Sequence, residues 1–413
     1  MSFKDRIKDL PQRVNTSPWA AGIFILVLLI PIVILWISCL PFTDGDLNIT
    51  IMTWIGFMES HGYWRALAYP FANYSPAYLY VLMIIAYMEN VPMEIYVKVF
   101  SIILDIGMAC LTYQIVKQKY KTRFYPILAA ITLLASPVVW MDSALWGQCD
   151  SFYTFFLLGF IWLMSKDKPV WAMVSFALAF ALKPQPIFIA PFIGVLVFRR
   201  KIPWWTLFLV PAVYILFALP AWYAGRPFID LLTIYVAQEQ WTSNHFLSMN
   251  AANLYVFFRE PFLSPVPGYI ITGVGAVLFF LTALWKKRKV TTGYIVIMAM
   301  FIDYLISFLL PNLHERYIYA AAVLLVVASF FRKELFWAAV LLQAATVMSF
   351  MPFLFGGSIA WVQAGAVLNT LTLGVLIYCY LAWSFPQIKK PKKGWWGRMF
   401  IWQEDPPELD ESN

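Results

Sequence analysis

Long apolar runs recur along the 413-residue chain and constrain its fold more than any other feature. A helix needs about 20 residues to cross the hydrocarbon core of a bilayer. The first run covers 18–41, and further runs follow up to residue 383. Hydrophobic residues make up 62% of the chain and charged residues 13%, whereas soluble domains average about 25% charged residues. The sequence therefore predicts an all-α polytopic membrane protein.

The net charge of +8 reflects membrane topology and does not indicate binding of nucleic acid. Basic residues gather at the two ends and in short loops, as is usual on the cytoplasmic side of a membrane. The basic loops and tail are 117–123, 166–168, 199–201, 286–289, 332–333 and 389–393. This pattern predicts a multi-pass protein of the plasma (inner) membrane with about 12 spans and cytoplasmic N- and C-termini. The loops between these basic segments are then expected to face outward.

The distribution of polar segments predicts a single integral membrane domain over 1–383. Its outward side carries a first loop over 42–91 and a large loop over 223–266. Residues 384–413 form a basic and aromatic tail, which we expect to lie on the cytoplasmic membrane surface. The four cysteines show no metal-binding spacing, and Cys149, which alone lies near a candidate motif, is most simply a small buried residue.

Four apolar segments are too short to cross the bilayer on ordinary helix geometry. Segments 48–58 and 76–88 lie within the first outward loop, so we expect helices in or on the outer leaflet. Segments 169–182 and 185–198 each cover about 21 Å as helices, against a core of roughly 30 Å. Their junction at 183–186, Lys-Pro-Gln-Pro, is therefore expected below the outer surface, where a charged residue lines a water-filled cavity.

The first outward loop contains "FTDGDL" at 42–47, which places Asp44 and Asp46 two residues apart. This pattern is also that of a D-x-D motif, in which two acids hold a metal on a nucleotide sugar. Nucleotide sugars are cytosolic and this loop is predicted to face outward, so that alternative is not favoured. Nothing in the sequence supports a divalent metal or another cofactor. Solvated loop carboxylates are the plainer explanation of both acids.

Further polar residues gather in three other outward motifs, "MDSALWGQCDS" at 141–151, "KPQP" at 183–186 and "NLHERY" at 312–317. Each has a plain structural alternative. Asp150 or Ser151 could be a helix N-cap, Lys183 a lysine that reaches from lipid to water, and the last motif the start of a helix with an interfacial salt bridge. The candidate residues are Asp142, Gln148, Asp150, Lys183, Gln185, His314, Glu315 and Arg316.

Taken together, these motifs favour chemistry on a lipid-linked phosphosugar. The phosphate needs Lys, Arg or His side chains or a helix N-terminus, and the acceptor hydroxyl needs one carboxylate as a base. Asp105 and Asp303 lie inside predicted spans and have no assignable partner. Lys98 is about 10 Å from Asp105 along a helix, too far for a direct pair.

The ordered motifs resemble those of the GT-C glycosyltransferases, which use polyprenyl- or dolichyl-phosphate sugars. Within them, the chain is most similar to bacterial mannosyltransferases related to a mannosyltransferase of GPI-anchor synthesis. The matching stretches are "GDL" (45–47), "NYSPAYLYV" (73–81), "SPVVWMDSALWGQCDS" (136–151), "LKPQPIFIAP" (182–191), "LSMNAANLY" (247–255) and "LHERYIY" (313–319).

This resemblance implies an inverting transfer of a hexose, by default mannose, from a polyprenyl-phosphate donor to a glycan, glycolipid or protein acceptor. It implies that Asp46 is the general base, and Asp44 is left as either a supporting or a solvated carboxylate. Asp142, Gln148 and Asp150 match positions that shape the sugar or acceptor site. Donor phosphate and sugar contacts are implied for Lys183, Gln185, His314, Glu315 and Arg316. Asn250 and Asn253 match an asparagine pair in the large outer loop of the family. Ser75–Pro76 departs from the more usual Pro-Pro.

Two other classes of protein stay open. A secondary transporter would show an internal repeat and ionisable residues near the membrane centre. The sequence shows no six-plus-six similarity, and most of its polar residues gather at one face. A flippase or non-catalytic binder of lipid-linked sugars would share the phosphate-binding residues but would need no base.

Overall fold

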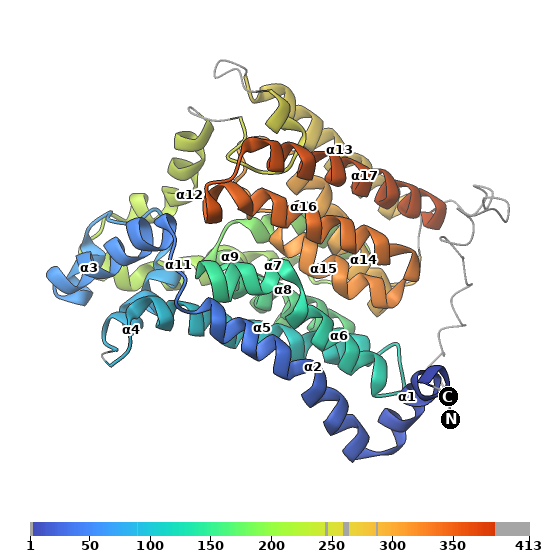
Figure 1. Cartoon of the computed structure of the whole chain (residues 1–413). Coiled ribbons are helices and arrows are strands. Elements are labelled where there is room, and N and C mark those ends of the chain that lie inside the picture. Colours follow the sequence, from blue (N-terminus) through green and yellow to red (C-terminus); the bar gives the residue numbers. More distant parts are fainter. Residues whose placement is uncertain (1–2, 89, 244–246, 259–263, 286–287, 385–413) are drawn as a thin grey trace.

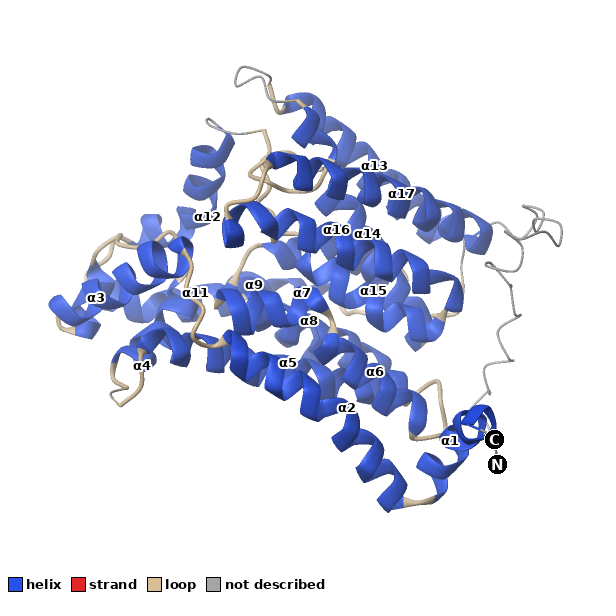
Figure 2. Cartoon of the chain, in the orientation of Figure 1, coloured by secondary structure: helices blue, strands red, loops and turns tan. Residues whose placement is uncertain are grey.

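The computed structural model describes residues 3–88, 90–243, 247–258, 264–285 and 288–384, which form a bundle of helices (Figures 1 and 2). The predicted tail over 384–413 lies almost wholly outside them. The described residues contain no sheet, only isolated bridges from Met249 and Asn250 to His314. The prediction of an all-α protein is confirmed.

The helices are α1 (Phe3–Thr16), α2 (Pro18–Cys39), α3 (Met52–Ser60), α4 (Pro76–Ala86), α5 (Met93–Val116), α6 (Phe124–Ala135), α7 (Pro137–Trp140), α8 (Asp150–Ser165), α9 (Pro169–Leu182), α10 (Ala190–Phe198), α11 (Leu209–Tyr223), α12 (Phe228–Ser243), α13 (Val266–Trp285), α14 (Thr292–Leu309), α15 (Tyr319–Phe331), α16 (Phe336–Phe355) and α17 (Ile359–Ser384).

Short irregular helical segments interrupt this pattern. Two are π-helical, Leu47–Ile51 and Met141–Trp146, and such turns are frequent at functional sites. Asp46 directly precedes the first, and Gln148 follows the second by two residues. The 3-10 segments are Tyr63–Ala68, Gln185–Ile189, Trp204–Phe208, Leu254–Phe257 and Lys333–Leu335.

Seven helices of the described chain are long and apolar enough to span a membrane by length and composition. They are α2, α5, α13, α14 and α17, and also α11 and α16 together with the 3-10 segments before them. The pair Phe124–Ala135 and Pro137–Trp146, bent by 47°, makes an eighth if it is counted as one span. A total of about 12 requires that the shorter helices α8, α9, α10 and α15 also cross, and that number stays a prediction. In Figure 1, α1 and the end of α17 lie on the same side of the bundle, opposite α3.

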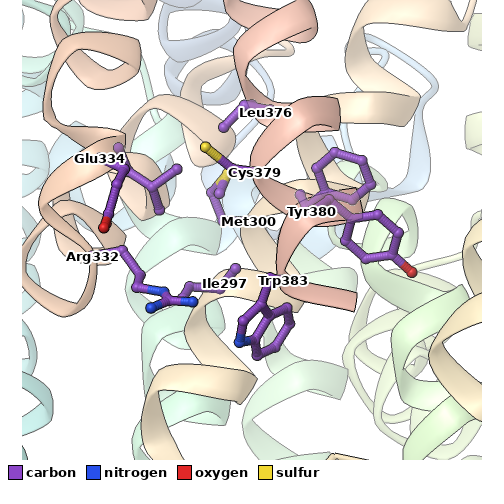
Figure 3. A pocket seen from close by; sticks show the side chains of 10 residues that line it. Ile297, Met300, Arg332, Glu334, Leu376, Cys379, Tyr380 and Trp383 are labelled. Atoms are coloured by element: carbon purple, nitrogen blue, oxygen red, sulfur yellow. The ribbon is translucent and has the colours of Figure 1, made fainter. Parts of the chain in front are cut away.

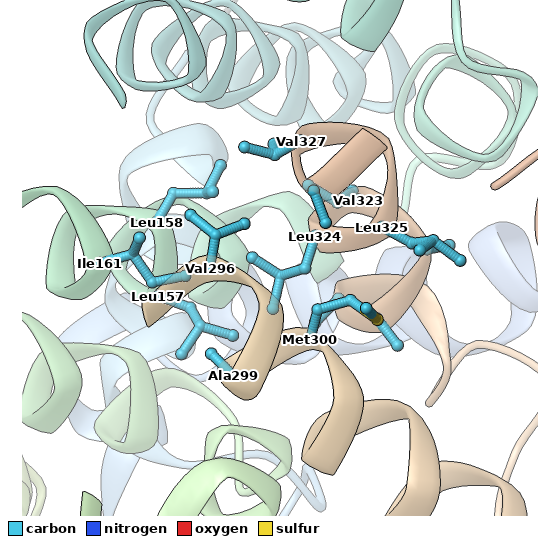
Figure 4. Packing of buried hydrophobic residues seen from close by; sticks show 14 of the residues in the cluster. Leu157, Leu158, Ile161, Val296, Ala299, Met300, Val323, Leu324, Leu325 and Val327 are labelled. Atoms are coloured by element: carbon cyan, nitrogen blue, oxygen red, sulfur yellow. The ribbon is translucent and has the colours of Figure 1, made fainter. Parts of the chain in front are cut away.

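The centre of the bundle is built by α8, α14 and α15, whose aliphatic side chains interdigitate (Figure 4). Leu157, Val296 and Leu324 are fully buried there. By contrast, α2 exposes Ile23 and Val27 among many apolar side chains, as a lipid-facing helix does. Backbone hydrogen bonds are satisfied within each helix, so an apolar environment forces the helical form on these runs.

The loop that is predicted to be the first outward one packs as a separate apolar cluster at one end of the bundle. Trp54 of α3 and Leu82 of α4 are buried together with Ala221 of α11 and Leu231 of α12. Segment 48–58 is helical as predicted, and segment 76–88 is helical up to Ala86; their position in the outer leaflet stays a prediction. This cluster joins the two predicted outward loops, so Asp46 is attached to a packed unit.

Close packing of α8 against α9 predicts a large effect of substituting Gly159. A Cβ atom there would lie 2.6 Å from Oγ of Ser175, which itself donates to the Phe156 carbonyl. We expect Gly159→Val to destabilise the protein by about 1–3 kcal/mol through overpacking. The control is Gly22→Val, because a Cβ on Gly22 of α2 meets nothing within 4 Å. Thermal unfolding of the detergent-solubilised variants measures the difference, and equal melting temperatures would contradict this view of the interface.

Candidate active site

Polar motifs from four separate parts of the sequence meet in one cluster of side chains. Asp46 lies before the segment Leu47–Ile51, Gln148 lies before α8, and Lys183 lies at the end of α9. Arg316 lies in the loop between α14 and α15. The contacts run from Asp46 through Gln148 to Arg316, and from Arg316 through Asp150 to Lys183.

The carboxylate of Asp46 accepts hydrogen bonds on both oxygens. Nε2 of Gln148 donates to Oδ2 at 2.7 Å, and the hydroxyl of Thr50 donates to Oδ1 at 3.1 Å. Nη2 of Arg316 lies 3.7 Å from Oδ2. The Asp46 side chain is nevertheless 25% exposed. It is therefore held in a defined orientation and stays reachable from outside the protein.

Arg316 is the centre of the cluster. Its Nε donates to Oε1 of Glu315 at 2.8 Å, and its Nη1 donates to Oε1 of Gln148. Nη1 also lies 3.9 Å from Oδ2 of Asp150, and the guanidinium stacks 5.1 Å above the ring of Trp146. A planar guanidinium with five N–H donors suits this many-sided contact. A lysine could not reach these groups at the same time.

Lys183 forms a buried ion pair with Asp150. Its Nζ lies 2.8 Å from Oδ1 of Asp150, and the two side chains are 5% and 0% exposed. Its charge also lies 5.3 Å from the ring of Tyr74 and 6.0 Å from that of Tyr153. Lys183 does not reach into water. The alternative in which its side chain extends from the lipid into water is therefore wrong. The alternative of an N-cap by Asp150 or Ser151 is also wrong, because Cys149 takes the N-cap position of α8 without a side-chain bond.

The predicted anion-binding residues are brought together, but each cation already faces a carboxylate. Lys183 faces Asp150, and Arg316 faces Glu315 and Asp46. Burial alone raises the pKa of Glu315, but contact with His314 and the charge of Arg316 outweigh it and hold the pKa below its usual value. The cluster therefore keeps its charges in a buried site by mutual compensation.

His314 and Glu315 are held by the large loop. Residues 314–317 do not begin a helix, since α15 starts only at Tyr319. The amide of Glu315 donates to the carbonyl of Met249, and the amide of Met249 donates to Leu313. The side chain of His314 is 21% exposed, with Nδ1 3.7 Å from Oε2 of Glu315. The backbone pairing thus orients this motif toward the cluster.

The predicted asparagine pair, Asn250 and Asn253, lies in the same large loop. Asn250 has φ +59°, a left-handed conformation that Asn tolerates better than most residues, and its carbonyl accepts a hydrogen bond from Ser349. Oδ1 of Asn253 accepts from the amide of Tyr255, and its Nδ2 donates to the Leu310 carbonyl. These contacts shape the loop, and a substrate contact for either asparagine stays a prediction.

Three further predicted site residues are buried beside or near the cluster. Asp44 is 7% exposed and its Oδ1 accepts from the amide of Leu47 at 2.9 Å. Burial raises the pKa of Asp44 despite that bond, so a solvated carboxylate is the wrong picture. Asp142 and Gln185 are 0% and 3% exposed. Within the described chain, no donor reaches either carboxylate oxygen of Asp142 or the side-chain oxygen of Gln185.

Several residues at the site were not singled out from the sequence. Tyr74 and Trp146 lie inside the matching stretches, so their place in a motif was the available signal. Thr50 follows Asp46 by one helical turn, a spacing that brings the two side chains together. Lys98, a buried lysine within an apolar run, lies close to the start of the first loop.

This cluster coincides with neither a metal-binding group nor the cavity that lies near Arg332. No group of three or more His, Cys, Asp or Glu residues is arranged to hold a metal ion in the ranges that the structure describes. A small cavity of about 30 Å³ lies elsewhere, between Arg332, Met300 and Tyr380 (Figure 3). It shares no residue with the cluster.

The buried pair of Lys183 and Asp150 predicts a specific pattern of stability. Removing one partner leaves an uncompensated buried charge, so we expect Lys183→Met to destabilise the protein by about 3–5 kcal/mol. The double variant with Asp150→Asn should recover most of that loss. Unfolding in detergent measures both, and Arg13→Met is the control because the Arg13–Asp9 pair is exposed. A double variant no more stable than Lys183→Met alone would contradict the pairing.

The family model of glycosyltransferase family 87 matches residues 71–311, more than half of the chain. No curated protein matches the chain. The matched range includes Gln148, Asp150 and Lys183, but it excludes Asp46 and Arg316. The predicted resemblance to glycosyltransferases is confirmed, whereas the narrower resemblance to mannosyltransferases stays a prediction. The protein belongs to glycosyltransferase family 87, and its apolar helices make it a membrane glycosyltransferase.

Proposed function

We propose that this glycosyltransferase moves a hexose from a polyprenyl-phosphate-linked donor to an acceptor hydroxyl at the outer membrane face, with Asp46 as the general base. One observation carries the proposal. The Asp46 side chain is 25% exposed, whereas Asp44, Asp142, Asp150 and Glu315 are at most 7% exposed. A general base must come within hydrogen-bond reach of the proton that it removes. Among these acids, Asp46 meets that requirement best.

In the proposed reaction, the acceptor hydroxyl gives its proton to the Asp46 carboxylate. The acceptor oxygen forms a bond to the anomeric carbon while the bond from that carbon to the phosphate oxygen breaks. The bonding electrons leave with the polyprenyl phosphate. Attack opposite to the leaving group inverts a β-linked donor into an α-linked product. Because a phosphate leaves readily, the reaction needs no general acid.

Lys183 and Arg316 are the proposed contacts of the donor phosphate. Negative charge grows on the phosphate as the sugar bond breaks, and preorganised cations in a water-poor site stabilise it. Arg316 lies 3.7 Å from Asp46, so a phosphate held there would be close to the base. Asp150 and Glu315 keep these cations charged before the donor arrives, and the partly exposed His314 lies beside them.

Apolar surface around the first loop supports lateral entry of a lipid-linked donor. Ile49 is 75% exposed, Ile84 of α4 50% and Tyr87 62%. Such side chains are typical of a surface in contact with lipid. Mannose is the sugar that we expect from the family resemblance, and the acceptor is a glycan, a glycolipid or a protein.

Replacement of the proposed base is the direct test. We expect Asp46→Asn to reduce transfer roughly 10²- to 10⁴-fold, the usual contribution of a general base. Binding of the donor should be nearly unchanged, because the cations remain. Transfer of label from a radiolabelled polyprenyl-phosphate mannose measures the first, and equilibrium binding of the same donor measures the second.

Glu59→Gln is the matched control, because Glu59 is an exposed acid in the same loop. Full activity of Asp46→Asn would show that Asp46 is not the general base. A wild type that binds the donor and never forms a product would instead support a flippase or a non-catalytic binder.

The donor class has its own test. Purified protein is incubated in membrane extract with a panel of radiolabelled polyprenyl-phosphate sugars and, in parallel, with nucleotide sugars. We expect a labelled product from polyprenyl-phosphate mannose and none from a nucleotide sugar once synthesis of lipid-linked sugars is blocked. The chemical nature of the labelled product identifies the acceptor. Transfer from a nucleotide sugar under that block would contradict the proposed donor.

A further inference from the structure

Three buried polar residues form a stripe along one face of α5, and the reaction outlined above uses none of them. Lys98, Ser101 and Asp105 are spaced three and four residues apart, which places them on one face of a helix. They are 0%, 1% and 0% exposed. Buried polar groups in an apolar bundle are costly unless they have partners, so their partners show what the stripe does.

Lys98 binds the end of α2 and the start of the first loop. Its Nζ donates to the carbonyls of Cys39 at 3.2 Å, Leu40 at 3.1 Å and Phe42. The last carbonyls of a helix have no partner within that helix, and a buried ammonium with three donors satisfies them. Phe42 lies four residues before Asp46. Lys98 therefore fixes the chain just before the proposed base.

The other two residues bind the segment that carries Gln148. Oγ of Ser101 donates to the backbone carbonyl of Gln148 at 2.7 Å, and Oδ1 of Asp105 accepts from the hydroxyl of Ser143 at 3.1 Å. The hydroxyl of Ser151 donates in turn to the carbonyl of Ser101 at 3.3 Å. One face of one helix thus holds both segments.

The two segments also touch each other around Lys98. Gly147 has φ +79°, and a Cβ on it would lie 3.3 Å from Cδ1 of Leu47 and 3.3 Å from Cγ of Lys98. Leu47 directly follows Asp46, and Gly147 directly precedes Gln148. The contact leaves little room for either segment to move.

We propose that Lys98, Ser101 and Asp105 are positioning residues, which set the Asp46 carboxylate against its amide donor Gln148 at 2.7 Å. The proposal rests on the role of Asp46 given above. None of the three touches the exposed side of Asp46, so they act through the loops. A displacement of about 1 Å at a reacting group can lower a rate roughly 100-fold.

A double-mutant cycle separates positioning from general support of the fold. We expect Lys98→Met to lower kcat roughly 10- to 100-fold, while the Kd of polyprenyl-phosphate mannose stays the same. In an Asp46→Asn background, Lys98→Met should change the residual rate very little, because the group it positions is already lost. Ser101→Ala should show the same pattern more weakly, and it serves in place of Lys98→Met if that variant fails to fold.

Lys119→Met is the control. Lys119 follows α5 and donates to the carbonyl of Phe331 at the end of α15, so it is also a lysine bound to the end of a helix. We expect it to leave kcat and donor binding unchanged. Equal losses from Lys98→Met in the wild-type and Asp46→Asn backgrounds, or a weakened donor Kd, would show support of the fold only and would overturn the proposal.

Hydrogen exchange keeps this test separate from that of the proposed function. If Asp46→Asn is fully active, Asp46 is not the general base, and the expected effect of the stripe on kcat no longer holds. The positioning itself is then decided by amide exchange in the segment 43–48. Faster exchange in Lys98→Met than in Lys119→Met supports it, and equal exchange overturns it.

Discussion

A guanidinium buried among helices needs acceptors for its donors, and Arg316 finds them in segments from separate parts of the chain. Glu315, Gln148, Asp150 and Asp46 all lie within 4 Å of it. Removing any one acceptor leaves charge or donors uncompensated in a medium of low polarity. This requirement explains why these acids and cations meet within an otherwise apolar bundle. It also defines the orientation of Asp46, which Gln148 links to Arg316.

The rest of the fold brings the segments of this cluster within reach of one another. The backbone of Met249 orients residues 313–315, the stripe on α5 holds the loops that carry Asp46 and Gln148, and the hydroxyl of Ser75 donates to the carbonyl of Ala181 just before Lys183. Irregular backbone is tolerated inside an apolar bundle where other protein groups satisfy it. The π-helical segments beside Asp46 and Gln148 are examples.

Much of the helical pattern could be predicted, because length and hydropathy act locally. The breaks at 183–186 and the short helices of the first loop were expected from run length alone, and the structure has them. The errors have a common cause. Asp150 was weighed as a cap, Asp44 as a solvated acid and Lys183 as a lysine reaching water, because sequence reasoning considered each with its neighbours in the chain. Their actual partners are 33 residues away for Lys183 and Asp150, and burial decides the state of Asp44.

The sequence by itself determined the all-helical membrane class, the short helices of the first loop and the motifs proposed to carry chemistry, since these follow from local hydropathy and residue type. It also made Asp46 and Arg316 candidates, but it did not show that they lie 3.7 Å apart. Only the tertiary structure decided which acid is exposed, which cation pairs with which carboxylate, and that Lys98 holds the first loop. Those outcomes depend on long-range packing, in which every buried charge must find a partner from elsewhere in the chain.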